Sequence, residues 1–399
     1  MILRSGMFDD NVYDRSVVKR LQKVWKPVAE GCYADHDAAV RTQESAMQAV
    51  RISEQAAAMQ DAAAAGRVPV IRSCRMAVCT ECLPGGGTLS AMSAQLALTG
   101  AVNELAAKGL QAETVQVSLL LPEGGEEALL RTITDAISTT AAAANVTVTG
   151  FHGMVTAAAE RPIITISAMG GESLFGLKGG ESRGLKDDEA QSCSAGESVD
   201  HRKEDSGEKD SRENDDAPPD EILAIGHIAM EGTAVLTRAR RTELEKRFPM
   251  QMLGRSEELL DHLNLLPAIR TMADLGIRPR RMVAASDGGI YAALWELARV
   301  CGSGFTVELP EIPILQETIE ITDYLGVNPY QMQSKGLALA VTANAEEAAE
   351  MLMDHGVYAK PIGWMTAGRD KVITNGDEHQ NLNRPEPDAV ICCLDGKEE

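Results

Sequence analysis

The chain has 399 residues, enough for two or three domains, and its 44% hydrophobic and 24% charged residues are typical of a globular protein. A formal net charge of −21 argues against nucleic acid or an anionic membrane surface as a partner, because both would repel the chain. No apolar run is long enough to span a bilayer and the N-terminus lacks the apolar core of a signal peptide, so we expect a cytoplasmic protein.

The first half of the chain alternates predicted helices and strands around one central helix, Leu96 to Gly109. Alternation of this kind predicts an α/β or α+β domain over residues 1–175. The other predicted elements are helices over 14–30, 41–65 and 126–144, strands over 68–72, 113–121, 145–150 and 161–169, and a tight turn over 151–153.

The central helix carries a polar notch, formed by Asn103 and Glu104. An amide and a carboxylate in so apolar a helix must be solvated, paired or functional. Two interpretations stay open: a surface turn in which Glu104 pairs with Lys108 at i,i+4, and a polar site. The apolar stripe of the helix consists of Leu98, Ala101, Val102, Leu105 and Ala106.

Three cysteines, Cys74, Cys79 and Cys82, have the C-x4-C-x2-C spacing of some iron–sulfur, zinc and redox sites. Cys32 is the nearby candidate for a fourth ligand. The eight cysteines of the chain are scattered, which suits a reducing compartment better than a disulfide framework. Incidental thiols are the favoured interpretation, and a redox or metal protein is a minor alternative.

Residues 176–220 interrupt the pattern. Between Glu181 and Glu221 there are 15 Asp or Glu and 6 Lys or Arg, and there is little apolar surface to bury. This composition predicts an acidic disordered insertion or linker, followed by a second α/β domain over 221–399. Its predicted elements are strands near 222–230 and over 282–285, 305–309, 337–342, 358–364 and 371–374, and helices over 237–248, 257–275, 291–302, 314–324 and 345–355.

A glycine pair in the second half separates a predicted strand from a predicted helix, in Asp287-Gly288-Gly289-Ile290. This order presents backbone N–H groups and the positive end of the helix dipole to an anion. Glycine pairs also begin ordinary helices, so a purely structural interpretation stays open.

Short motifs follow one another along the chain. The first half has D-A-A-V at 37–40, A-V-N-E-L-A at 101–106, V-S-L-L-L-P at 117–122 and T-G-F-H-G at 149–153. The second half has E-G-T-A at 231–234, D-G-G-I at 287–290, A-L-W-E at 293–296, G-V-N-P-Y at 326–330 and S-K-G at 334–336. As an ordered set they resemble the PurM-like superfamily, and among its members the AIR synthase-related, HypE-like proteins, over nearly the whole chain except the insertion.

The resemblance implies an N-terminal sheet domain that dimerises, with a C-terminal α/β domain beside it. It implies ATP and Mg²⁺ as cofactors, a homodimer, and phosphorylation or activation of an oxygen on an unknown small-molecule or thiol-group substrate. By resemblance, Asp37 and Glu104 would hold the metal, and Glu104 and His152 would be catalytic. ATP or the second substrate would contact Asn103, Gly153, Asp287, Gly288, Gly289, Ser334 and Gly336.

The chain also departs from the family's pattern. Tyr33 and Asp35 stand where early glycines would be, Gly153-Met154 replaces a Thr-Glu pair, and Val283-Ala284 replaces a His-Asp pair. The loss of acids favours an alternative, a degenerate non-catalytic homologue that binds a nucleotide, a ligand or a partner protein. Residues 395–399 contain no cysteine, so dehydration of a thiocarboxamide on a terminal cysteine, as in HypE, is not expected.

Overall fold

The computed structural model describes residues 6–7, 12, 14–21, 24, 75–83, 88–175 and 219–394. The chain divides into two compact units: unit 1 is Met1–Ala106 with Leu110–Glu172, and unit 2 is Ala107–Gly109 with Ser173–Glu399.

Several predicted features lie outside the described residues. They are the helix over 41–65, the strand over 68–72, Asp37, Cys74 and residues 176–218 of the acidic insertion. The domain boundaries at 175 and 221 stay predictions.

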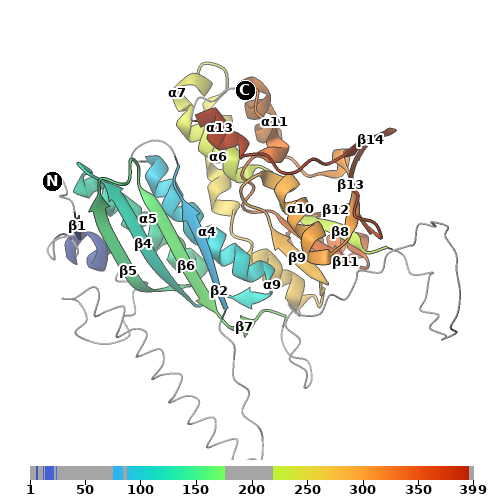
Figure 1. The fold of residues 1–399 in the computed structure, drawn as a ribbon, viewed down its shortest axis with the longest axis horizontal. Coiled ribbons are helices and arrows are strands. Elements are labelled where there is room, and N and C mark those ends of the chain that lie inside the picture. The colour runs from blue at the N-terminus through green and yellow to red at the C-terminus, as the bar shows by residue number, and fades with distance from the viewer. Residues whose placement is uncertain are drawn as a thin grey trace, which may run out of the picture. The chain divides into compact units, whose positions relative to one another are not determined.

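Unit 1 contains, among its described residues, a five-stranded sheet with one buried face (Figure 1). Strands β4 and β5 are parallel and the other neighbours are antiparallel. Side chains alternate between the two faces of a strand, and in β4 Val115, Val117, Leu119 and Leu121 are buried while the residues between them are half-buried. The strand order is β1 (Gly6–Met7), β5 (Thr147–Thr156), β4 (Thr114–Pro122), β6 (Ile163–Gly170), β2 (Arg75–Glu81).

Two long helices, α4 (Thr88–Ala107) and α5 (Glu127–Ala144), lie behind this sheet in Figure 1. Helix α5 is amphipathic and buries Leu130, Ile133 and Ile137 completely. It ends because Asn145 adopts a left-handed backbone conformation, with φ of 54°. Both helices confirm predicted ones.

Helix α4 begins at Thr88, not at Leu96 as predicted. Its first two turns are rich in serine and alanine, which carry no apolar periodicity and so gave no helix signal. These small residues are nevertheless buried: Ser93 is 1% exposed and its hydroxyl donates to the Leu89 carbonyl at 3.1 Å. A serine that bonds to the preceding turn is compatible with a buried helix.

A short helical segment near the N-terminus contacts α5. It consists of a π-helical turn, Asp14–Val18, and α2 (Lys19–Leu21). Val17 and Leu21 are fully buried. The helix predicted over 14–30 is therefore confirmed as far as Leu21.

Unit 2 contains a seven-stranded sheet in its described part, with helices packed around it (Figure 1). β10 and β13 are parallel, and the other neighbours are antiparallel. Strands β8 and β11 are buried on both faces, which explains their continuous apolar sequences. The strand order is β14 (Glu378–Asn381), β13 (Lys371–Asn375), β10 (Gly304–Glu308), β12 (Ala359–Thr366), β8 (Glu221–Ile225), β11 (Ala338–Thr342), β9 (Arg281–Ala284).

The remaining elements follow in chain order. The α-helices of unit 2 are α6 (Met230–Ala239), α7 (Arg241–Leu244), α8 (Met250–Glu258), α9 (Leu266–Asp274), α10 (Gly289–Cys301), α11 (Gln316–Leu325), α12 (Ala345–Asp354) and α13 (Ala389–Leu394). The 3-10 turns are Leu259–His262, Leu309–Glu311 and Pro329–Gln331, and two short strands are β3 (Leu110–Gln111) and β7 (Glu172–Ser173).

Three predictions of secondary structure are wrong. The single helix predicted over 257–275 is broken by the 3-10 turn and three irregular residues. The motif at 231–234, expected as a turn before a charged helix, lies inside α6. Residues 151–153, expected as a tight turn, continue strand β5. Strand β2, over the cysteine-bearing stretch 75–81, was not predicted. Helix α13 and strand β14 were not predicted, because their short sequences carry no clear period.

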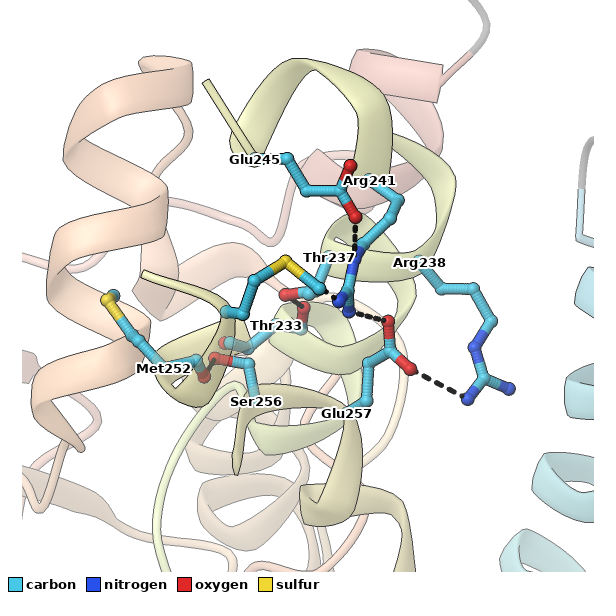
Figure 2. A network of polar contacts seen from close by, with 9 residues as sticks. Thr233, Thr237, Arg238, Arg241, Glu245, Met252, Ser256 and Glu257 are labelled. Atoms are coloured by element: carbon cyan, nitrogen blue, oxygen red, sulfur yellow. Dashed lines mark hydrogen bonds and ion pairs between the residues drawn. The ribbon is translucent and has the colours of Figure 1, made fainter. Parts of the chain in front are cut away.

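Helices α6, α7 and α8 are joined by an ion-pair network (Figure 2). Glu257 accepts from Arg238 at 3.1 Å through one carboxylate oxygen and from Arg241 at 2.7 Å through the other. Arg241 also donates to Glu245 at 2.8 Å. One carboxylate therefore connects three helices.

None of the described helices is long and apolar enough to cross a lipid bilayer.

Glu127, at the first turn of α5, holds the N-terminal segment in place. Its carboxylate accepts from Arg15 and Arg131, each at 2.7 Å, and from the Ser16 hydroxyl at 2.8 Å. The hydrogen bond from Arg15 is the main reason that the pKa of Glu127 falls from 4.5 to about 2. Burial of the carboxyl raises its pKa, whereas the hydrogen bonds from Ser16 and Arg131 lower it further.

We predict that Glu127→Gln lowers the free energy of unfolding by about 1–3 kcal/mol at pH 7, the value typical of hydrogen bonds to a charged group. Because the folded-state pKa lies below the ordinary value, this stabilisation is present above pH 4.5 and is lost as the pH falls towards 2. Urea denaturation at several pH values measures it. The control is Asp135→Asn on the same helix, whose partner is Arg20 and whose side chain is 54% exposed. It should cost about 0–1 kcal/mol, and equal losses for both variants would contradict the prediction.

Candidate functional site

The turn between β9 and α10 has the shape expected of an anion-binding helix start. Gly288 and Gly289 both have left-handed backbone conformations, with φ of 73° and 64°. A Cβ atom on Gly289 would lie 2.5 Å from the Tyr330 carbonyl oxygen and 2.6 Å from that of Met332. Glycine is therefore required here by backbone packing alone, and its presence does not by itself indicate a ligand.

A second loop packs directly on this turn. The Ser334 amide donates to the Ser286 carbonyl at 3.1 Å. The Ser334 hydroxyl donates to the Met332 carbonyl at 2.7 Å and accepts from the Ala229 amide at 2.8 Å. The structure thus brings together five residues that the sequence had singled out at separate places, namely Asp287, Gly288, Gly289, Ser334 and Gly336.

The charged centre of this region is a buried ion pair that the sequence analysis did not select. Lys335 Nζ lies 2.8 Å from Glu231 Oε1, and the Lys335 amide donates to Glu231 Oε2 at 3.0 Å. The two side chains are 1% and 0% exposed. A buried charge is tolerated only when it is paired and hydrogen-bonded, so the S-K-G and E-G-T-A motifs depend on each other.

Asp388 was also missed, and it lies on the glycine turn. The Gly288 amide donates to Asp388 Oδ2 at 2.8 Å, and the Val390 amide donates to Oδ1 at 2.9 Å. Burial is the main reason that the pKa of Asp388 is raised from 3.8 to about 6, with a further contribution from the charge of Asp287. The one sequence signal was an aspartate directly before the short helix α13, a position typical of an N-cap.

Gln333 completes this region. Its side-chain nitrogen lies 3.4 Å from Asp287 Oδ1, and the residue is 2% exposed. Its side-chain oxygen is buried and has no hydrogen-bond partner among the described residues. Buried amide oxygens are nearly always paired, so this oxygen marks a place where a further donor fits.

In unit 1 the predicted site residues lie on two elements. Asn103 is 1% exposed in the middle of α4, and Glu104 beside it is half-buried. His152 is half-buried on β5, between the buried residues Phe151 and Gly153. Because the faces of a strand alternate, His152 points to the half-exposed face of the sheet and the Gly153 position to the buried face.

The cysteine cluster is only partly described. Cys79 lies on strand β2 with its sulfur 3.6 Å from Glu81 Oε1, and Cys82 follows the strand. In the part of the chain that the structure describes, no group of three His, Cys, Asp or Glu side chains is arranged to hold a metal ion. Cys74, which the metal interpretation of this spacing requires, lies outside the described residues.

Comparisons with known proteins show what this chain resembles. Residues 217–375 match the family described as AIR synthase related protein, C-terminal domain. A putative hydrogenase expression/formation protein of Methanocaldococcus jannaschii is 26% identical over 283 residues, which are 70% of this chain and 72% of that protein. The carbamoyl dehydratase HypE of Rhodobacter capsulatus is 24% identical over 275 residues, which are 67% of this chain and 66% of that enzyme.

A solved structure shares the fold. The hydrogenase maturation protein HypE in complex with ATP has a TM-score of 0.59 at 17% identity, over 82% of this chain and 89% of that one. Likeness at this identity shows the fold. The PurM-like α/β fold expected from the sequence is therefore confirmed.

The buried pair supports a prediction about stability. We expect Lys335→Met to lower the free energy of unfolding by about 3–5 kcal/mol, because Glu231 would be left as an unpaired buried charge. Chemical denaturation at pH 7 measures the loss. The double variant Glu231→Gln/Lys335→Met, which removes both charges, should recover part of it.

The matched control is Arg255→Met. Arg255 pairs with Glu317 at 2.8 Å, but its side chain is 64% exposed. Removing an exposed pair should cost about 0–1 kcal/mol. A Lys335→Met loss as small as that of Arg255→Met would show that the buried pair does not stabilise unit 2.

Proposed function

We propose that this chain, an AIR synthase-related protein of the HypE-like kind, is an ATP-dependent enzyme that phosphorylates or otherwise activates an oxygen of its substrate. The observation that carries the proposal is the likeness of fold, over most of both chains, to a protein solved in complex with ATP. The name carbamoyl dehydratase of one relative supports activation of an oxygen as the chemistry. The substrate itself stays open.

The described residues of unit 2 fit a phosphate-bearing ligand. The N-terminus of α10 has the dipole that favours an anion, and the buried oxygen of Gln333 can accept from a hydroxyl or from a bound water. Lys335 does not supply free positive charge, because Glu231 neutralises it. We therefore assign Asp287, Gly288, Gly289, Ser334 and Gly336 to ligand contact through the backbone shape they create. When bound, ATP would supply the phosphoryl group.

Magnesium would be held in unit 1. We propose Glu104 and Asp37 as its carboxylates, with Asn103 orienting a phosphate oxygen or a metal-bound water. Mg²⁺ needs only one or two protein carboxylates and keeps several waters, so this pair is sufficient. The half-buried position of Glu104 leaves its carboxylate within reach of solvent.

His152 would act as a proton donor or acceptor. An imidazole ring can donate a proton from one nitrogen and accept one at the other. His152 lies on the half-exposed face of the sheet, and this restricts where its reaction partner can bind. The group that it serves must approach from that face, and Gly153 would contribute to the shape of the strand rather than to the same contact.

We predict that the protein binds ATP in a Mg²⁺-dependent manner, measured by calorimetric titration with and without Mg²⁺. Glu104→Gln should weaken binding about tenfold or more in Mg²⁺ and reduce the metal dependence, because it removes a ligand charge. The control Glu160→Gln, an exposed carboxylate in the same unit, should leave binding unchanged.

Failure to bind at millimolar ATP would refute the enzyme proposal. Binding that ignores Glu104→Gln would refute the metal assignment alone. Binding without turnover of ATP would instead favour a non-catalytic homologue.

We propose that the half-exposed face of the unit 1 sheet forms a homodimer. On strand β2 the apolar side chains of Met76 and Val78 are 63% and 51% exposed on this face. Such side chains are commonly covered by a partner, and the family resemblance suggests a second copy of the chain.

Val78→Asp should then shift the protein from dimer to monomer in analytical ultracentrifugation. Met353→Asp, at a residue 50% exposed on α12 of unit 2, should not, and a monomeric wild-type protein would refute the proposal.

A further inference from the structure

The last part of the described chain forms a strap over the glycine turn. We define this C-terminal strap as residues 382–394, which follow β14 and include α13. It begins after residue 375, where the match to the family domain ends. Residues 382–388 of the strap have no regular secondary structure.

Hydrogen bonds fasten the strap at several points. They are Leu382 N to Lys371 O at 2.7 Å, Trp295 Nε1 to Asn383 O at 2.6 Å, Gln331 Nε2 to Glu386 Oε2 at 3.3 Å, Gly288 N to Asp388 Oδ2 at 2.8 Å, and Arg240 Nη2 to Cys393 O at 3.0 Å. The contacts of Asn383 and Glu386 are exposed, whereas Val390 of α13 is fully buried. The irregular part of the strap, 382–388, should therefore open more easily than α13.

The contact at Asp388 occupies the place an anionic ligand would need. Helix α10 has 13 residues, and its N-terminus carries partial positive charge. Of the two glycine amides, that of Gly288 donates to the Asp388 carboxylate and that of Gly289 donates to the Ser286 carbonyl at 3.2 Å. The helix start therefore already binds a carboxylate, and that carboxylate belongs to the chain itself.

We propose that the C-terminal strap is an intramolecular competitor of the anionic ligand. Asp388 holds the Gly288 amide in the closed state, and a phosphate group binds the N-terminus of α10 when the strap is displaced. This inference rests on the proposed function, because it assumes that the glycine turn receives the phosphates.

A second observation points to a ligand at the same turn. The buried oxygen of Gln333 lacks a partner among the described residues, while the nitrogen of the same amide contacts Asp287 in the turn. A closed strap thus satisfies the Gly288 amide, while the oxygen of an amide that contacts the same turn stays without a partner among the described residues. Displacement of Asp388 by a larger, hydrated or hydroxyl-bearing group gives that oxygen a donor.

Burial disfavours the charged form of Asp388 in the closed strap, and the neighbouring charges modify this effect. Asp287 on the turn repels it, Lys335 on the neighbouring loop attracts it but is neutralised by Glu231, and Glu386 lies two residues away on the strap. Burial is the main reason that the pKa of Asp388 is raised to about 6, and the charge of Asp287 adds to it. A raised pKa in the closed state means that closure is favoured below pH 3.8 and weakens as the pH rises through 6. At neutral pH the strap is therefore the easier to displace.

The experiment compares ATP and inorganic pyrophosphate binding to the full chain with three variants. Asp388→Ala removes the competing carboxylate and should tighten binding of both probes about tenfold. Trp295→Phe removes the hydrogen bond to Asn383 without changing any charge, so a gain in affinity there cannot come from electrostatics. Asp377→Ala, an exposed acid in the turn before β14, is the control and should leave the affinity unchanged.

Hydrogen–deuterium exchange gives the second readout. Addition of pyrophosphate should increase exchange of the strap peptide in the wild-type protein, and Trp295→Phe should increase it without any ligand. Unchanged affinity in both Asp388→Ala and Trp295→Phe, with a strap that stays protected when ligand binds, would overturn the competitor proposal while leaving ATP binding intact. If no variant binds either probe, the proposed function fails, and the competitor proposal fails with it.

Discussion

The interaction on which unit 2 depends is the buried pair of Glu231 and Lys335. Neither charge is tolerated alone in an apolar interior, and the pair is almost completely removed from solvent. It connects the first turn of α6 to the loop at 334–336. That loop in turn holds the glycine turn through the Ser334 amide and the Ser286 carbonyl. The ion pair thus helps to fix the loop that packs on the candidate ligand site.

A glycine pair before a helix can be required by backbone packing or by anion binding, and the sequence alone does not distinguish the two. The structure does distinguish them at Gly288 and Gly289. Gly289 is required because the 330–332 backbone approaches it closely, whatever the turn binds. The electrostatic property of the turn is independent of that packing, and the structure illustrates it with a carboxylate, that of Asp388, on the Gly288 amide. A phosphate bound at this turn, as we propose, would meet the same amide under the same dipole. Structural necessity and anion binding are therefore compatible at this turn.

In unit 1 the positions of the candidate site residues on β5 depend on the sheet, because successive side chains of a strand point to opposite faces. One face of the sheet is buried, and the other carries His152 together with the exposed apolar residues of β2. The two neighbouring residues expected to share a ligand, His152 and Gly153, face opposite sides of the strand. A dimer contact on the half-exposed face and a catalytic role for His152 on that face are consequently linked, because both depend on what covers it.

The sequence by itself determined the fold class and most of the regular elements. Apolar alternation in β4, continuous apolar runs in β8 and β11, and the amphipathic period of α5 are local properties, so they could be recognised before any contact was known. The ordered motifs indicated the PurM-like fold in the same way. Tertiary structure alone decided the rest. Glu231 meets Lys335 across 104 residues and Gly288 meets Asp388 across 100, and no local pattern signals such pairs. The side of the sheet to which His152 points, and the burial of the serine-rich start of α4, were likewise set by packing, because they depend on neighbours that lie far away in the chain.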